Sequence, residues 1–131
     1  MKLRVYADTS VFGGCFVDEF SEFSNKLIEE FNQGIKRLVV SDLTLKEIEN
    51  APEEVQGILR TIPGDFKEYV TLEKDSKYLA RKYIDEKAIN KKHIIDSQHI
   101  AIATVNRVDV LASWNFKHIV NLRRINLYNA A

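Results

Sequence analysis

Three acidic residues occupy positions where their carboxylates could converge on a cation. Asp8 follows an apolar opening segment, Glu47 lies in a helical segment after Ser41, and Asp96 stands near the start of a strongly apolar helix. Carboxylates held close together repel and raise one another's pKa, so a protein that gathers three of them usually places a metal among them. Oxygen ligands with little nitrogen or sulfur favour Mg²⁺ or Mn²⁺ over zinc. The three acids therefore predict a divalent-metal site.

Each acid also has a purely structural interpretation. Asp8 could satisfy backbone donors in a loop or cap a following helix. Thr44 and Glu47 have the spacing of a capping box, in which the glutamate only closes a helix start. Asp96 could simply favour the positive end of its helix. A carboxylate in the first turn of a nearly all-apolar helix is nevertheless costly to desolvate without a cation or donors, and His99, one turn on, is expected on the same face.

A further polar segment follows the strand expected at 108–113. Ser113 and Asn115 could supply a hydroxyl and a carboxamide to a metal or to its water. The alternative is an ordinary passage from strand to turn, with Trp114 in the core.

Hydrophobic periodicity predicts the elements that must position these residues. Apolar runs predict strands at 3–7, 38–41, 69–72, 108–113 and 125–128, and helices over 20–31, 42–50, 52–62, 76–88 and 94–105. Residues 8–14, with a Gly-Gly pair, are expected to form a loop. Strands that alternate with helices predict an α/β fold with a parallel sheet covered on both faces, in one domain over residues 1–131. The working site of such a sheet lies beyond the carboxyl ends of its strands.

Composition narrows the classes of protein. The 131 residues include 19 Lys and Arg against 19 Asp and Glu, which excludes holding nucleic acid or an anionic membrane by bulk positive charge. The single cysteine, Cys15, excludes a disulfide framework and a multi-cysteine zinc site, and is expected to be a partly buried hydrophobe. No apolar run approaches the ~18 residues of a membrane span, and the first residues lack a signal peptide's apolar stretch. We expect no membrane association and a cytoplasmic location.

Four short motifs follow in an order and spacing known from one family: Asp8-Thr9-Ser10 after the first strand, Glu47 in a Ser-Asp-Leu-Thr-Leu-Lys-Glu stretch, Asp96-Ser97-Gln98-His99-Ile100-Ala101, and Ser113-Trp114-Asn115. Together they resemble the PIN domain, most closely the VapC-like ribonuclease toxins and their solitary relatives. The resemblance covers essentially the whole chain. It implies a three-layer α/β/α fold with a central, mostly parallel sheet, and cleavage of RNA phosphodiester bonds with Mg²⁺ or Mn²⁺.

The resemblance also implies roles for individual residues. Asp8, Glu47 and Asp96 would be the catalytic acids that bind the metal, whose bound water would attack the phosphodiester in line. Ser10 would be the nearby hydroxyl, and Ser113 would correspond to the family's Thr or Ser before a fourth acidic position.

The chain departs from the family's pattern at that fourth position. Many members have an acid there, whereas this chain has Asn115, with His118 three residues further on. Asn115 can still bind a metal through its carbonyl oxygen but brings no charge, which puts a second metal or the rate in doubt. We expect His99 and His118 to have supporting roles, and we expect Asp109 to lie at the wrong end of its strand to substitute.

Toxin relatives imply an RNA substrate, a small antitoxin protein as partner and a homodimer. The candidate RNA contacts are basic residues beside two of the motifs: Lys91, Lys92 and Lys117. These charges could position phosphates without reading sequence, although a Lys-rich surface break is the plainer interpretation.

Other functions remain open on the sequence. The main alternative is a catalytically weak PIN-fold module that binds RNA or protein, which Asn115 favours. A receiver-like signalling domain has a slim basis in Asp42, after the second strand. A nucleotide-binding fold is less favoured still, because Gly13-Gly14 is not a phosphate-binding loop.

Overall fold

The computed structural model describes residues 2–87 and 93–115, which group into two compact units. The first comprises residues 2–71 and 108–114, and the second comprises residues 72–87 and 93–107 with Asn115. The single domain expected over residues 1–131 stays a prediction. In the described ranges, no helix is long and apolar enough to cross a membrane.

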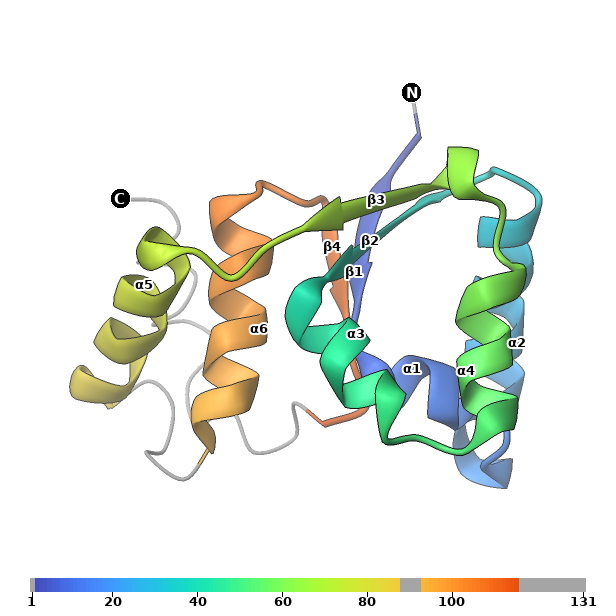
Figure 1. The fold of residues 1–131 in the computed structure, drawn as a ribbon, viewed down its shortest axis with the longest axis horizontal. Coiled ribbons are helices and arrows are strands. Elements are labelled where there is room, and N and C mark those ends of the chain that lie inside the picture. Colours follow the sequence, from blue (N-terminus) through green and yellow to red (C-terminus); the bar gives the residue numbers. More distant parts are fainter. Residues whose placement is uncertain (1, 88–92, 116–131) are drawn as a thin grey trace. The chain divides into compact units, whose positions relative to one another are not determined.

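The first unit is built on a parallel sheet (Figure 1) of the strands β1 (Arg4–Ala7), β2 (Arg37–Ser41), β3 (Lys67–Val70) and β4 (Val110–Ala112). Their spatial order is β3-β2-β1-β4. Val5 of β1 is in register with Leu38 of β2 on one side and with Val110 of β4 on the other. The order therefore reverses between β1 and β4, and open α/β sheets bind ligands beyond the carboxyl ends of strands at such a point.

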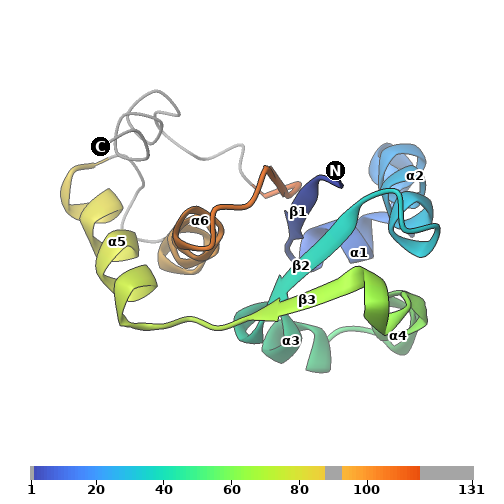
Figure 2. The same cartoon turned by 90° about the horizontal axis from the view of Figure 1, so that it is seen from above.

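Four helices cover one face of this sheet: α1 (Thr9–Gly14), α2 (Asp18–Asn32), α3 (Asp42–Glu49) and α4 (Glu53–Thr61). Figure 2 shows α1, α2 and α4 on the same side of the strands. Alternate strand residues such as Val5, Leu38 and Val40 share one core with the buried sides of these helices. Complete burial of such a side chain contributes about 1.5–3 kcal/mol. The opposite alternation gives Tyr6 and Ser41 to the other face.

The turn from α2 to β2 depends on a glycine. Gly34 has a φ of +73°, and a Cβ atom there would lie 2.8 Å from the ring of Phe66, in the short 3₁₀ helix η1 (Gly64–Phe66). Both the conformation and the space favour a residue without a side chain.

The second unit consists of α5 (Lys74–Asp85) and α6 (Ile94–Val105), which pack together. The Ser97 hydroxyl donates to the Ala80 carbonyl at 2.7 Å, and the Tyr83 hydroxyl donates to Thr104 Oγ1 at 3.4 Å. The central residues of α6 are buried, as its apolar sequence predicts.

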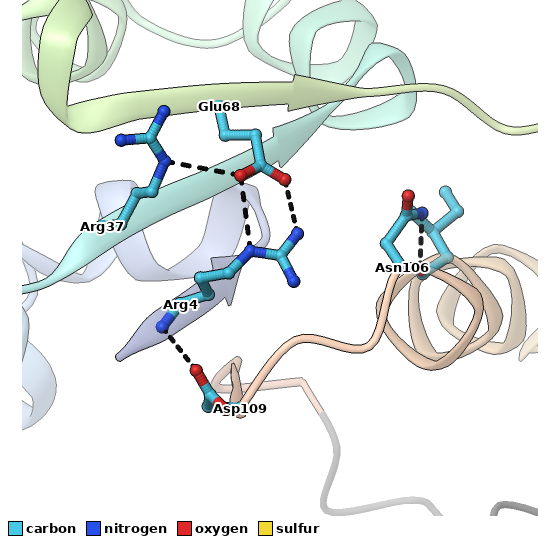
Figure 3. A network of polar contacts seen from close by, with 6 residues as sticks. Arg4, Arg37, Glu68, Asn106 and Asp109 are labelled. Carbon is cyan, nitrogen blue, oxygen red and sulfur yellow. Dashed lines mark hydrogen bonds and ion pairs between the residues drawn. The ribbon is translucent and has the colours of Figure 1, made fainter. Parts of the chain in front are cut away.

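A polar network ties the amino ends of the strands together (Figure 3). Arg4 and Arg37 both contact the Glu68 carboxylate, Arg4 through Nη2 and Nε and Arg37 through Nε at 3.4 Å. The hydrogen bonds from Arg4 are the main cause that holds the pKa of Glu68 below its usual value. Asp109 accepts from the backbone N–H of Arg4 at 2.8 Å. Asp109 is thus at the opposite end of β4 from Ser113, as expected.

Most predicted elements are confirmed, and α6 has the predicted bounds. The loop expected at 8–14 is wrong: the chain turns into α1 there because Asp8 caps the helix and Val11 and Phe12 pack into the core. The strand expected at 69–72 starts earlier, at Lys67, because Glu68 has arginine partners within the sheet. The strand expected at 125–128 lies outside the described residues.

Candidate functional site

Asp8 lies at the point where the strand order reverses. It is the first residue after β1, its backbone N–H donates to the Ala112 carbonyl at the end of β4 at 3.4 Å, and its side chain is 2% exposed. Asp8 is also the N-cap of α1, with the Ser10 N–H donating to Oδ1 at 3.1 Å. The capping interpretation is therefore right, but it accounts for only part of what holds the carboxylate.

Two hydroxyls donate to the two oxygens of the Asp8 carboxylate. Ser10 Oγ lies 2.6 Å from Oδ1, and Ser113 Oγ lies 2.5 Å from Oδ2. The two hydroxyl oxygens are 3.2 Å apart. Ser10, expected near the acids, and Ser113, expected at the same end of the sheet, therefore meet at Asp8 from α1 and from the end of β4. Such contacts fix the direction of the carboxylate lone pairs and add no charge.

Glu47 reaches the same end of the sheet from α3. Its Oε1 accepts from the Thr9 hydroxyl, on the residue next to Asp8, at 3.1 Å. The capping-box interpretation of Glu47 is wrong, because α3 begins at Asp42 and its cap is Ser41, whose Oγ accepts from the Thr44 N–H. Glu47 lies beyond the first turn and contacts another helix.

A buried tyrosine hydroxyl lies within electrostatic range of both carboxylates. Tyr6 Oη lies 2.8 Å from Ser41 Oγ, and Ser41 Oγ lies 3.4 Å from Thr44 Oγ1. Burial raises the pKa of Tyr6 well above its usual range, and the charges of Asp8 and Glu47 raise it further. The site thus has two carboxylates and, near them, a chain of buried hydroxyls.

Trp114 lies partly buried at the edge of this site. Its ring stacks on Phe20 with 4.4 Å between centroids and meets Phe23 edge-on at 5.5 Å. Its indole N–H donates to Ser24 Oγ at 2.9 Å, and its backbone N–H donates to Ser10 Oγ at 2.9 Å. Trp114 thus packs against α2 but is only partly buried and lies outside the core in which the sequence had suggested it. Cys15, the residue that follows α1, is buried as expected, and burial raises the pKa of its thiol.

Asp96 and His99 belong to the second unit. Asp96 is in the first turn of α6 and half-buried, with Oδ2 3.9 Å from His93 Nδ1. His99 is buried, 1% exposed. Asp96 therefore has the place at the positive end of a helix that was expected for it.

The remaining predicted site residues are less fully described. Asn115 is the last described residue and is exposed. Lys91, Lys92, Lys117 and His118 lie outside the described residues. Within residues 2–87 and 93–115, no three His, Cys, Asp or Glu side chains gather closely enough to hold a metal ion.

The sequence reasoning named the hydroxyls of Ser10 and Ser113 but missed several others, namely those of Thr9, Tyr6, Ser41 and Ser24. Thr9 follows Asp8 directly, and Tyr6 and Ser41 alternate away from the apolar core, so a period-two count on β1 and β2 would have put them on the same face. Ser24 carried no signal, because a single serine in an amphipathic helix has no distinguishing spacing.

Comparison with solved structures shows similarity to two VapC structures. The chain is 10% identical to VapC20 of Mycobacterium tuberculosis, described as a sarcin–ricin loop cleaving toxin, with a TM-score of 0.62 over 87% of this chain and 92% of that one. It is 12% identical to a chain of VapBC2 from Rickettsia felis, solved bound to a DNA fragment of its promoter, with a TM-score of 0.61 over 90% and 94%. No protein-family model matches the sequence, and no curated protein matches it.

These matches show the fold. The expected resemblance to the PIN fold of VapC-like proteins is confirmed, and so is the three-layer α/β/α class with a parallel sheet.

Proposed function

We propose that this chain is a divalent-metal-dependent ribonuclease that hydrolyses RNA phosphodiester bonds, with Asp8, Glu47 and Asp96 as its catalytic acids. The observation that carries this proposal is the pair of carboxylates at the carboxyl end of the sheet: Asp8 accepts from two serine hydroxyls, and Glu47 accepts from Thr9, the residue next to Asp8. Asp8 lies where the strand order reverses, in a fold similar to that of VapC20, a toxin described as cleaving the sarcin–ricin loop.

The chemistry of the donors fits a hard cation. Carboxylate oxygens of Asp8 and Glu47, with the hydroxyls of Ser10 and Ser113 beside them, suit Mg²⁺ or Mn²⁺. Such a cation, when bound, lowers the pKa of a coordinated water and neutralises phosphate oxygens. In this proposal the two serines orient Asp8 and Asp96 contributes the third carboxylate.

The other residues of the proposed site have supporting roles. Thr9 holds the Glu47 carboxylate through its hydroxyl. Asn115 is proposed to bind the metal or its water through its carbonyl oxygen, and His99 and His118 to support the acids. Lys91, Lys92 and Lys117 are proposed to contact RNA phosphates, because ammonium groups attract phosphates without reading bases.

The similarity to the VapBC2 structure supports a biological setting for this activity. We propose that the chain is the toxin of a type II toxin–antitoxin pair, acts in the cytoplasm as a homodimer, and is blocked by a small antitoxin protein. Co-purification of an antitoxin encoded beside the gene would test the pairing.

The experiment that tests the proposal compares two acids at equivalent places in the second unit. Asp96 is in the first turn of α6 and Asp75 is in the first turn of α5. Asp96→Asn and Asp75→Asn each remove one charge from a helix start and keep the side-chain shape. Cleavage of ribosomal RNA and of a mixed-sequence RNA is measured with Mn²⁺ and with EDTA.

We expect wild-type cleavage with Mn²⁺ and none with EDTA. Asp96→Asn should lower the rate by more than about 100-fold, since a ligand matters at least as much as its outer-shell support. Asp75→Asn should cleave like the wild type. Full activity in Asp96→Asn contradicts the role of Asp96. RNA binding without any Mn²⁺-dependent cleavage by the wild type would instead support the alternative, a catalytically weak binding module.

A further inference from the structure

Trp114 connects both oxygens of the Asp8 carboxylate to helix α2. Its backbone N–H donates to Ser10 Oγ, whose own hydroxyl donates to Asp8 Oδ1. The residue before it, Ser113, donates to Asp8 Oδ2. Because one residue lies next to both serines in the hydrogen-bond network, the placement of its main chain fixes both hydroxyl donors.

The main chain of Trp114 is in turn held by its side chain. The indole N–H donates to Ser24 Oγ in α2, and the ring lies flat on Phe20, a further residue of that helix. Ser24 is fully buried. A hydrogen bond and a stacked ring leave the side chain little rotational freedom, so the turn after β4 is tied to a helix that contributes no acid to the site.

The space for this contact depends on α1. A Cβ atom at Gly14 would lie 2.6 Å from Ser24 Oγ and 2.7 Å from Trp114 Nε1, which is too close for either atom. Gly14 therefore leaves room for the indole to reach Ser24. Three separate elements, α1, α2 and the end of β4, therefore meet at the hydrogen bond between the indole and Ser24.

We propose that Trp114 is a positioning residue: its indole, bound to Ser24, holds the Ser113 and Ser10 hydroxyls on the Asp8 carboxylate. The consequence for metal binding rests on the proposed function, whereas the positioning itself does not. Loss of the indole–Ser24 contact lets the turn after β4 move and the two hydroxyls lose their alignment with Asp8.

The chain offers a matched control in the next residue of α2. Asn25 Nδ2 donates to the Cys15 carbonyl at 3.2 Å, so it also joins α2 to the end of α1 but has no contact with Trp114 among its described hydrogen bonds. Asn25→Ala loosens the two helices in general. Ser24→Ala removes the acceptor of the indole, and Trp114→Phe removes its N–H while keeping an aromatic ring for stacking.

The first measurement is the ¹³Cγ chemical shift of Asp8 in metal-free protein, which reports the hydrogen bonds that its carboxylate accepts. We expect the resonance to move in Ser24→Ala and in Trp114→Phe, to move no further in the double variant, and to stay in place in Asn25→Ala. An unmoved resonance in Ser24→Ala, or an equal movement in Asn25→Ala, overturns the positioning role. Ser24→Ala serves alone if Trp114→Phe fails to fold.

The second measurement is a Mn²⁺ titration of the same four proteins and the wild type. Ser24→Ala and Trp114→Phe should weaken Mn²⁺ binding by about tenfold, in the range of outer-shell substitutions, and Asn25→Ala should not. Wild-type protein that binds no Mn²⁺ contradicts the proposed function, while the Asp8 resonance still decides the positioning role. Wild-type affinity in both variants, with Mn²⁺ bound normally by the wild type, overturns the link between Trp114 and the metal.

Discussion

The two ends of the sheet in the first unit hold a carboxylate in different ways. At the amino ends of the strands, two guanidinium groups from Arg4 and Arg37 contact Glu68. At the carboxyl ends, hydroxyls of Ser10 and Ser113 and a backbone N–H contact Asp8. These contacts come from the two ends of the same sheet: those to Glu68 come from charged groups, and those to Asp8 come from neutral groups.

The two kinds of contact suit different roles for a carboxylate. A guanidinium group compensates the charge of a carboxylate and lowers its pKa, which suits a fixed link between strands. A hydroxyl directs the carboxylate lone pairs and brings no positive charge. The hydroxyl contacts of Asp8 are therefore compatible with the metal-binding role that we propose for it.

The largest expected effect on RNA cleavage separates two substitutions that each remove one carboxylate charge, one at each end of the sheet. Asp8→Asn keeps a good helix cap, because Asn and Asp are equally favoured at that position, but removes the charge. We expect Mn²⁺-dependent RNA cleavage to fall by more than about 100-fold, beyond the usual effect of outer-shell changes. Glu68→Gln should cleave at the wild-type rate. Initial rates at saturating Mn²⁺ measure both, and a Glu68→Gln rate as low as that of Asp8→Asn would erase the distinction between the two ends.

A smaller effect on Mn²⁺ affinity is expected from a substitution just after β4, and none from a substitution just before it. Ser113→Ala removes the donor to Asp8 Oδ2, and we expect Mn²⁺ affinity to fall by about tenfold because an outer-shell donor is lost. Asp109→Asn, at the opposite end of β4, should bind Mn²⁺ like the wild type. Calorimetric titration gives both affinities. Ser113→Thr keeps the hydroxyl and should bind Mn²⁺ like the wild type. If it binds as weakly as Ser113→Ala, the lost hydrogen bond is not the cause of the lower affinity.

The fold of this unit was largely predictable because its signals are local. Apolar runs such as Leu38 to Val40 predict buried strands, and the apolar periodicity of α2 predicts its buried side. Helix α1 was missed because Gly13 and Gly14 favour a turn, and only the three-dimensional contact of Gly14 with Trp114 and Ser24 explains a glycine there.

The surroundings of Asp8 were largely predictable from the sequence, and those of Glu47 less so. Asp8, Ser10 and Ser113 follow strands, and polar residues directly after parallel strands were the ones sought. The partner of Glu47 depends on where α3 begins, and Ser41 rather than Thr44 caps it. Which hydroxyl meets which carboxylate is decided by packing between elements far apart in the sequence.

A moderate effect on the stability of the protein is expected at the amino ends of the strands, where Glu68 lies. The pKa of Glu68 is lowered in the fold, so its contacts stabilise the protein fully above the ordinary pKa, near 4.5, and lose that contribution as pH falls through the lowered value. Glu68→Gln should cost about 1 kcal/mol at pH 7, a modest figure because the pair is partly exposed.

Urea unfolding of wild type and Glu68→Gln, from pH 7 down to about pH 3, measures this dependence. The difference between the two proteins should shrink as the pH falls below the ordinary glutamate range. A difference that stays constant across that range would mean that the cost arises from packing and not from the charge of Glu68.

The smallest effect is expected at the second carboxylate of the site. Thr9→Val removes the hydroxyl that donates to Glu47 Oε1 and keeps the shape of the side chain. Glu47 is held on a helix of its own, so the loss affects its orientation alone, and we expect Mn²⁺ affinity to fall by about threefold, below the usual outer-shell range. Thr9→Ser is the matched control, because it keeps the hydroxyl. A Mn²⁺ titration that finds Thr9→Val equal to Thr9→Ser would show that Glu47 needs no hydroxyl partner, and would confine the contrast between the two ends of the sheet to Asp8.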